Sequence, residues 1–187
     1  MKYLIVGLGN IGSEYHNTRH NIGFKILDAL AGASNISFED KRYGMVAEFK
    51  HRGRTFVLVK PSTYMNRSGM AVSYWLKQAK VPVDRMLVLV DDIALPFGSI
   101  RIRPKGGDGG HNGLANISQV IGHSNYARVR FGIGDDFHKG QQVNHVLGEW
   151  SKDEEKELPE LIDHSIEIIK GFGTVGLELT MTRLNKK

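Results

Sequence analysis

The chain has 187 residues, carries a formal net charge of +5 and contains no cysteine. This length fits a single domain of roughly 100–200 residues. Hydrophobic and charged contents of 41% and 24% are ordinary for a folded soluble protein and exclude disordered, collagen-like and coiled-coil sequences. The lack of cysteine excludes disulfides, thiol nucleophiles and thiolate metal sites. We expect one domain over residues 1–187 whose chemistry uses oxygen and nitrogen groups.

Apolar runs in the sequence are too short to cross a membrane. Glycines interrupt the N-terminal run at Gly7 and Gly9, and no small-residue cleavage pattern follows, so this segment does not resemble a signal peptide. The longest uninterrupted run, Met86–Val90, has the length of a strand, far below the roughly 20 residues of a transmembrane helix. These features favour a cytoplasmic protein, either an enzyme or an RNA-binding protein, that does not contact membranes.

Strands and helices alternate along the predicted chain. The apolar pattern predicts, in chain order, a strand at Lys2–Val6, a helix from Thr18, a hairpin of Met45–Lys50 and Thr55–Lys60, a helix at Ser68–Lys80, strands at Met86–Val90 and Ser99–Arg103, a helix at Leu114–Ile121, a strand at Ala127–Ile133 and a helical region at Asp153–Leu184. Met86–Val90 is apolar on both faces, as in a buried parallel strand. We expect an α/β fold, a three-layer α/β/α sandwich around a mixed, mostly parallel central sheet.

Gly7–Gly12 matches the G-x-G-x-x-G pattern of dinucleotide-binding proteins directly after the first strand. In those proteins a helix begins within the glycine loop, and a parallel second strand ends in an acidic residue that binds ribose. Here the polar residues Ser13–Asn17 follow the glycines, and the next two strands form a hairpin. This context disfavours a dinucleotide, and we expect no cofactor.

His20 and Asp91 are the strongest candidates for acid–base chemistry. Both follow strands at the carboxyl edge of the predicted sheet, where α/β proteins form their sites. The Asp91 carboxylate would accept the imidazole N–H of His20, select its tautomer and stabilise its protonated form. Asn10 and Tyr15 lie in the turn after the first strand. Taken alone, His20 also fits a surface or capping residue, and Asp91 a solvated turn.

Two further loops reach this edge. The loop after the hairpin carries Tyr64, Met65 and Asn66, which would line a substrate groove, although Met65 fits packing against the next helix equally well. The second loop has five glycines among residues 106–113 and leads into a helix, so its backbone N–H groups can approach an anion or an oxyanion. His111 and Asn112 stand at the start of that helix, where Asn112 is either a site residue or a simple N-cap.

Basic residues gather beside the glycine loop. Arg101 and Arg103 alternate with isoleucines along one strand, and Arg128 and Arg130 alternate with apolar residues along another. Together with Lys105 they predict a positive surface that suits phosphate groups, although such alternation is also typical of a solvated sheet face. The eight histidines show no paired metal-ligand spacing, and we expect no metal site.

The motifs together resemble those of the bacterial peptidyl-tRNA hydrolase family. They follow the family's order over nearly the whole chain and consist of Ile5–Asn10, Tyr15, Thr18–Asn21, Gly23, Pro61, Thr63–Asn66, Ser68–Gly69, Asp91–Asp92, Leu95–Pro96, Gly98, Gly106–Gly107, Gly109–Leu114, Arg130, Gly132–Gly134 and Val146–Gly148. The resemblance implies an enzyme that hydrolyses the ester between a peptide and the terminal ribose of tRNA. Because the sequence shows no obvious oligomer interface, we expect a monomer. The alternative is a non-catalytic RNA-binding or RNA-processing module on the same fold.

The resemblance also implies roles for individual residues. His20 would be the general base that activates water, with Asp91 holding it, while Asn10 would contact the peptide main chain. Asn112 would orient water or the oxyanion. Contacts to the acceptor stem, the CCA end and the peptide would come from Tyr15, Tyr64, Met65, Asn66, His111, Asn112, Arg103, Lys105 and Arg130.

Three positions depart from the family's pattern. Ile11 and Asp135 stand where the family often has proline, and Ala94 stands where an acidic residue is common. We expect these differences to change turn stiffness and details of tRNA contact, and to leave the catalytic residues unaffected.

Overall fold

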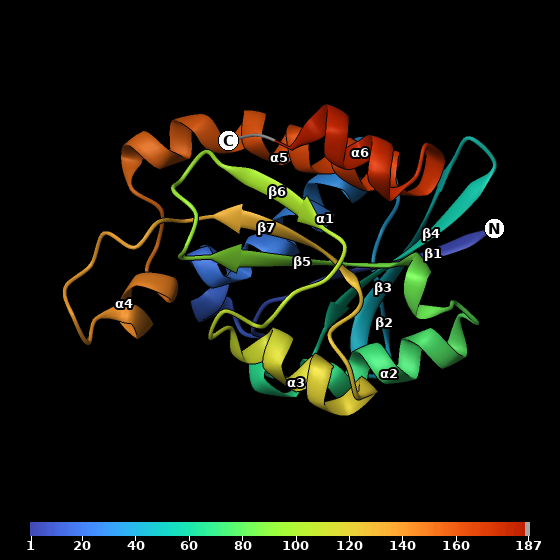
Figure 1. The fold of residues 1–187 in the computed structure, drawn as a ribbon, viewed down its shortest axis with the longest axis horizontal. Coiled ribbons are helices and arrows are strands. Elements are labelled where there is room, and N and C mark those ends of the chain that lie inside the picture. Colours follow the sequence, from blue (N-terminus) through green and yellow to red (C-terminus); the bar gives the residue numbers. More distant parts are fainter. Residues whose placement is uncertain (186–187) are drawn as a thin grey trace.

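A mixed sheet forms the middle layer of the structure, a computed structural model that describes residues 1–185 (Figure 1). Among these residues there are seven strands, in the spatial order β2 (Glu39–Lys41), β3 (Gly44–His51), β4 (Arg54–Pro61), β1 (Lys2–Gly7), β5 (Met86–Asp92), β7 (Ala127–Gly132) and β6 (Ile100–Arg103). β4, β1, β5 and β7 run parallel, whereas β3 and β6 pair antiparallel with their neighbours. The sheet is therefore mixed and mostly parallel, as predicted. The domain was expected to end at residue 187, and its last two residues lie outside the described part.

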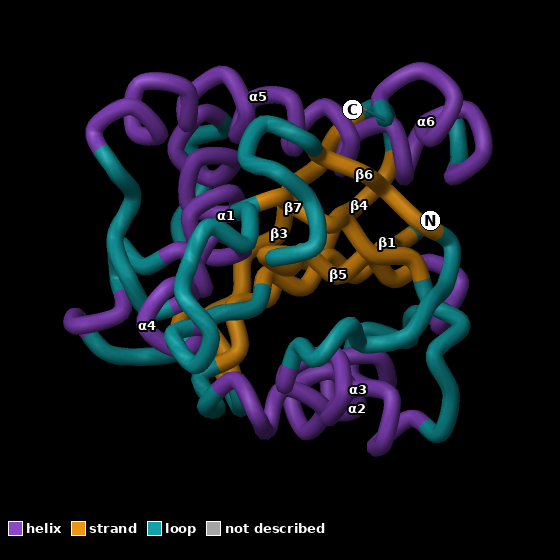
Figure 2. Tube along the Cα trace, turned by 60° about the vertical axis from the view of Figure 1, so that its left-hand side comes forward, coloured by secondary structure: helices purple, strands orange, loops and turns teal. Residues whose placement is uncertain are grey.

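Helices cover both faces of this sheet, which confirms the predicted three-layer fold (Figure 1, Figure 2). One layer contains α1 (Ile22–Ala33), α5 (Lys152–Thr174) and α6 (Leu177–Leu184), and the other contains α2 (Ser68–Gln78) and α3 (Asn112–Ile121). The short helix α4 (Gln142–Val146) lies beyond the carboxyl ends of β5 and β7 (Figure 1).

Strand β5 is buried on both of its faces. Leu87 and Leu89 belong to the core under α1 and α5, whereas Met86, Val88 and Val90 belong to the core under α2 and α3. The strand is a central parallel one, as its sequence predicts. Burial of each such side chain is favourable by about 1.5–3 kcal/mol. These contacts hold the carboxyl end of β5 firmly in place.

Two glycines bring the end of β1 against the start of α1. A Cβ atom on Gly7 would lie 2.4 Å from the carbonyl oxygen of Gly23, and a Cβ atom on Gly23 would lie 2.4 Å from the backbone nitrogen of Leu8. Both distances are far below van der Waals contact, so a side chain fits at neither position. Gly7 and Gly23 thus serve close backbone packing, and this packing brings the turn before α1 to the carboxyl edge of the sheet.

The boundaries of several elements differ from the prediction. The helix expected from Thr18 begins as a 3-10 turn at Arg19–Asn21 and becomes α-helical at Ile22. The C-terminal helical region is divided between α5 and α6 at Gly176, whose φ of 93° ends the first helix. The apolar pattern predicts neither β2 nor α4, because segments of three and five residues are too short to display a period.

Arg128 is buried, and its predicted place in a row of exposed arginines is wrong. Its side chain, 2% exposed, donates hydrogen bonds to the carbonyl oxygens of Gly106 (2.9 Å), Gly107 (3.2 Å) and Ser124 (2.9 Å). The guanidinium also lies 4.3 Å from the ring centroid of Tyr126. A guanidinium has five N–H donors, so it can satisfy several buried carbonyls at once. Arg128 therefore ties β7 to the start of the glycine loop.

We predict that Arg128→Met destabilises the protein by about 2–4 kcal/mol, because it leaves buried carbonyl oxygens without donors. Urea unfolding followed by circular dichroism measures the change. Arg101→Met, on the neighbouring strand and only partly buried, is the control and should change stability by less than about 0.5 kcal/mol. Equal stability of the two variants would contradict the structural role of Arg128.

Candidate active site

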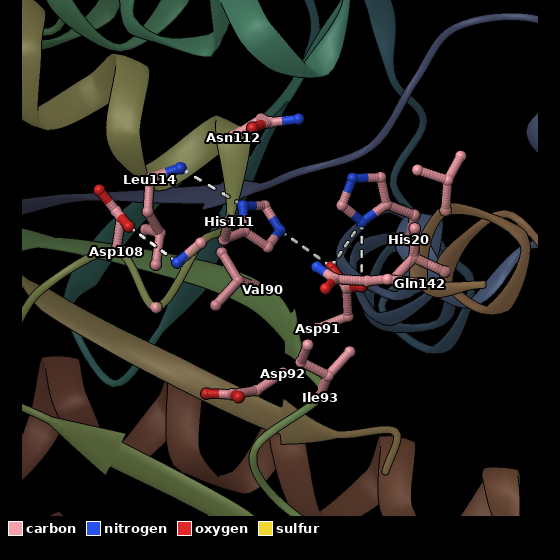
Figure 3. Close-up of a pocket in the computed structure, with 14 residues that line it drawn as sticks. His20, Val90, Asp91, Asp92, Ile93, Asp108, His111, Asn112, Leu114 and Gln142 are labelled. Atoms are coloured by element: carbon pink, nitrogen blue, oxygen red, sulfur yellow. Dashed lines mark hydrogen bonds and ion pairs between the residues drawn. The ribbon is translucent and has the colours of Figure 1, made fainter. Parts of the chain in front are cut away.

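His20 and Asp91 meet at the carboxyl edge of the sheet (Figure 3). Asp91 lies at the end of β5 and is 4% exposed, and His20 lies in the 3-10 turn before α1. The Nδ1 atom of His20 is 2.8 Å from Oδ1 and 2.9 Å from Oδ2 of Asp91. A carboxylate only accepts hydrogen bonds, so Nδ1 carries the proton and Nε2 of the neutral ring keeps a lone pair.

His111 approaches the same carboxylate from the glycine loop. Its Nε2 atom donates to Oδ1 of Asp91 at 2.9 Å. Its Nδ1 atom accepts hydrogen bonds from the backbone N–H groups of Gly113 (3.1 Å) and Leu114 (3.3 Å), so His111 is the N-cap of α3. The alternative in which Asn112 is the N-cap is therefore wrong. Asn112 is the first residue of the helix, and its side chain makes no cap.

The Asp91 carboxyl group is held in its ionised form. Burial by itself raises its pKa, but the nearby His20 imidazole and the hydrogen bonds from His111 and His20 outweigh burial and hold the pKa well below its ordinary value. Ionised Asp91 is thus the acceptor that both imidazoles require.

Asn10 is oriented by its neighbours. Its Oδ1 atom accepts the backbone N–H of Met65 at 2.8 Å. The side chain of Asn21 makes two hydrogen bonds to the backbone of Asn10. Its Oδ1 accepts the Asn10 N–H at 2.8 Å, and its Nδ2 donates to the Asn10 carbonyl oxygen at 2.9 Å. These bonds leave the side-chain amino group of Asn10 as a donor for a ligand.

One cavity at this edge contains four of the predicted site residues. His20, Asp91, His111 and Asn112 line it together with the end of β5, the glycine loop and α4 (Figure 3). Asn10 lines a neighbouring hollow between the turn after β1 and the end of β4. The cavity and the hollow flank the His20 turn, so a long substrate can extend to both sides of the imidazole.

The remaining loop residues lie outside the cavity. Tyr64 is 58% exposed and Asn66 is also exposed, whereas Tyr15 is partly buried. Met65 is 4% exposed and its sulfur lies close to Gly113, so its side chain packs in the core under α2 and α3. For the Met65 side chain the structure favours the packing alternative, while its backbone N–H positions Asn10.

Basic side chains lie along the β6–β7 edge. Arg101 is directly opposite Arg130 in the strand register, and Arg130 Nε donates to Oδ2 of Asp92 at 2.5 Å. Burial lowers the pKa of the partly buried Arg103 guanidinium, and the neighbouring Arg101 and Arg130 lower it further. Lys105 is exposed at the start of the glycine loop. Three arginines and a lysine thus give this edge a positive charge.

His20, Asp91 and His111 also have the side-chain types that bind metal ions, with ligand atoms within 4.8 Å of one another. The hydrogen bonds argue against a metal. Nδ1 of His111 accepts two backbone N–H groups, which keeps the proton on Nε2, and a protonated nitrogen cannot be a ligand. Across residues 1–185, no helix is both long and apolar enough to span a membrane.

Comparison with known proteins identifies the family. A sequence profile described as Peptidyl-tRNA hydrolase matches residues 4–187. A peptidyl-tRNA hydrolase of Porphyromonas gingivalis is 55% identical over 185 residues, 99% of this chain and 100% of that protein. The chain belongs to the peptidyl-tRNA hydrolase family. A second peptidyl-tRNA hydrolase, from Cytophaga hutchinsonii, is 53% identical over 187 residues and covers 100% of both chains.

A solved structure agrees with this peptidyl-tRNA hydrolase assignment. The crystal structure of peptidyl-tRNA hydrolase from Acinetobacter baumannii superimposes with a TM-score of 0.92 at 36% identity, covering 98% of this chain and 94% of that one. The resemblance that the motifs predict is therefore confirmed. The chain is an enzyme that hydrolyses peptidyl-tRNA, with tRNA as part of its substrate, and the alternative of a non-catalytic RNA-binding module is not favoured.

The sequence analysis gave no role to two sets of residues that build this cavity. Arg19, next to His20, donates to the carbonyl oxygen of His145 (3.0 Å) and to Oε1 of Glu154 (3.1 Å), and thereby ties the His20 turn to α4 and the start of α5. Helix α4 supplies the cavity wall through Gln142, Val143 and Val146. Arg19 and Val146 belong to the motifs of the family resemblance, but the partners of Arg19 lie more than a hundred residues away along the chain, so the sequence does not show what its side chain binds.

The lowered pKa of Asp91 predicts acid sensitivity. Its stabilising contribution is complete above about pH 4, the range of an unperturbed aspartate, and is lost as pH falls from there toward the lower folded value. Asp91→Asn should therefore cost about 3 kcal/mol at neutral pH and progressively less in acid. Urea unfolding of both proteins at neutral pH and near pH 3 measures this difference.

Asp153→Asn is the control, because the Asp153 side chain is 97% exposed. It should change stability by less than about 0.5 kcal/mol at either pH. A cost of Asp91→Asn that stayed constant down to acid pH would contradict the ionised, hydrogen-bonded state of Asp91.

Proposed function

We propose that His20 is the general base that activates water for attack on the ester of peptidyl-tRNA. The observation that carries this proposal is the hydrogen bond from Nδ1 of His20 to the buried Asp91 carboxylate. It places the free lone pair on Nε2, at the cavity side of the ring, and it stabilises the imidazolium that forms when the ring takes a proton from water. An ester is activated enough for this route, so an imidazole, a carboxylate and amide donors suffice without a metal or cofactor.

Asn112 and Asn10 supply the polar contacts to the reacting group and the peptide. Asn112 is the first residue of α3, where the positive end of the helix dipole favours the oxyanion of the tetrahedral intermediate. Its amide orients the attacking water or that oxyanion. The amino group of Asn10, held by the Met65 N–H, donates to the peptide main chain and favours N-blocked substrates over free aminoacyl-tRNA.

Residues on the surrounding loops position the two ends of the substrate. Tyr15, Tyr64 and Asn66 contact the CCA end and the adjoining peptide. Tyr64 is exposed on the loop after β4, where an aromatic ring is free to stack on a base. Met65 and His111 shape the groove, Met65 through its packing below the loop.

The β6–β7 edge binds phosphates of the acceptor stem through Arg103, Lys105 and Arg130. Asp92 holds Arg130 through Nε and leaves the two terminal guanidinium nitrogens for a phosphate. The register of Arg101 opposite Arg130 adds positive potential that attracts the RNA.

We further propose that the chain acts as one domain over residues 1–187, as a monomer in the cytoplasm. Hydrolysis of peptidyl-tRNA belongs to translation, which supports that location. The single continuous sheet supports one domain.

The decisive experiment measures release of labelled N-acetyl-amino acid from tRNA, with the unblocked aminoacyl-tRNA as the control substrate. The wild-type protein should cleave the blocked substrate far faster. His20→Ala should lower turnover by about 100-fold or more, because a general base contributes this much. The circular dichroism of His20→Ala should match the wild type. Near-normal turnover by a folded His20→Ala variant would remove His20 as the base.

The phosphate contacts are tested by salt dependence. Arg130→Ala should raise KM and flatten the fall of kcat/KM with salt by the equivalent of about one counterion, since one phosphate contact is lost. Arg52→Ala, at an exposed arginine in the turn between β3 and β4 in the other half of the sheet, is the control and should keep the wild-type slope. An unchanged slope for Arg130→Ala would exclude Arg130 from the tRNA interface.

A further inference from the structure

His111 connects the start of α3 with the Asp91 carboxylate. Through Nδ1 it caps the first turn of α3, and through Nε2 it donates to Oδ1 of Asp91. Its side chain is 8% exposed. A proton on Nδ1 would face the N–H groups of Gly113 and Leu114, so the ring is held as the neutral Nε2–H tautomer. A neutral, buried ring with both nitrogens engaged is suited to positioning and not to proton transfer.

The two imidazoles share one carboxylate oxygen. Oδ1 of Asp91 accepts from His20 at 2.8 Å and from His111 at 2.9 Å, and the two ring centroids are 4.9 Å apart. Each N–H donated to a carboxylate stabilises its charge and reduces the charge available to the other donor. The strength with which Asp91 favours protonated His20 therefore depends on His111.

We propose that His111 is a positioning residue that acts through Asp91. Its N–H donates to the carboxylate oxygen that also accepts from His20, and this hydrogen bond sets the pH above which His20 is unprotonated and can act as the base. This inference rests on the proposed role of His20 as the base. Without the His111 N–H, the full carboxylate charge acts on His20 and favours its protonated form. The base is then free only at higher pH.

Other charged groups around His20 are already engaged. From β5, Asp92 pairs with Arg130. From the glycine loop, Asp108 accepts the backbone N–H of Gly110 at 2.8 Å. The side chain of Arg19, in the same turn as His20, is bonded to Glu154.

Helix α4 faces the cavity with the uncharged residues Gln142, Val143 and Val146. Its histidine, His145, is bonded to the carbonyl oxygen of Ile133. Asp91 and His111 are thus the titratable side chains that bond to one another beside His20.

The test compares the pH profiles of kcat/KM for wild type, His111→Asn and His111→Ala on N-acetyl-aminoacyl-tRNA. Asparagine is a good N-cap, so His111→Asn keeps the α3 cap, but its shorter side chain does not reach Asp91. We expect the acid limb to move to higher pH by about 0.5–1 unit in both variants, a part of the one to three units that a nearby opposite charge produces. Both variants should lose thermal stability because Asp91 loses a donor, and His111→Ala should lose more because it also lacks the cap of α3.

Ser151→Ala is the matched control for loss of a helix cap. Ser151 caps α5 through a capping box and does not contact Asp91. It should lower thermal stability without moving the acid limb. An acid limb of folded His111→Asn that coincides with the wild type overturns the proposal, as does an equal shift in Ser151→Ala.

A second measurement on the wild-type chain does not depend on activity or on the variants folding. With ¹⁵N-labelled histidine, NMR should show the ring proton of His111 on Nε2, the nitrogen that donates to Asp91, and a lone pair on Nδ1. A protonated Nδ1 at His111 would overturn the proposal. Full activity of His20→Ala would instead refute the base itself, so the two failures are distinguishable.

Discussion

The buried carboxylate of Asp91 is the constraint on which the rest of the site depends. Removing an ionised carboxylate from water costs several kcal/mol unless donors replace the lost solvent. Here the donors are two imidazoles, one 71 residues earlier in the chain and one 20 residues later. Both segments must be in place before the carboxylate is satisfied. The same bonds select the tautomers of both rings, so burial and catalytic chemistry have a common cause.

The scaffold around Asp91 is stiff for identifiable reasons. β5 is packed on both faces, which fixes where the carboxylate stands. The contact of Gly7 with Gly23 lets α1 start against the end of β1, and it brings the His20 turn to the same edge. The buried guanidinium of Arg128 holds the start of the glycine loop through hydrogen bonds to the carbonyl oxygens of Gly106 and Gly107. The site is therefore held by backbone packing and buried hydrogen bonds, and its loops are fixed at their ends.

The end of β5 also connects the cavity with the positive edge of the sheet. Successive residues of a strand point in opposite directions. Asp91 accordingly meets the two imidazoles, while Asp92 meets Arg130 on the positive edge of the sheet. Arg19 makes a second connection: its guanidinium donates to the carbonyl oxygen of His145 and so joins the His20 turn to α4. Neighbouring residues of the same strand end thus hold the proposed base and the arginine that we propose as a phosphate contact.

Much of the fold was predictable because its signals are local. The two-sided apolar run of β5, the alternation in β6 and the stop of α2 before Pro82 each follow from residues close together in the chain. Short segments such as α4 and the 3-10 turn at Arg19–Asn21 could not be predicted, since a few residues display no period.

By itself the sequence determined the order of the elements, the family and the residue types able to perform hydrolysis. It did not distinguish Arg128 from Arg130, because alternation places both on one face and only neighbouring loops decide which is covered. Nor did it show that His111 rather than Asn112 caps α3, or that two histidines share Asp91. Those facts depend on distances between segments far apart in the chain, and such distances exist only once the sheet and helices have packed.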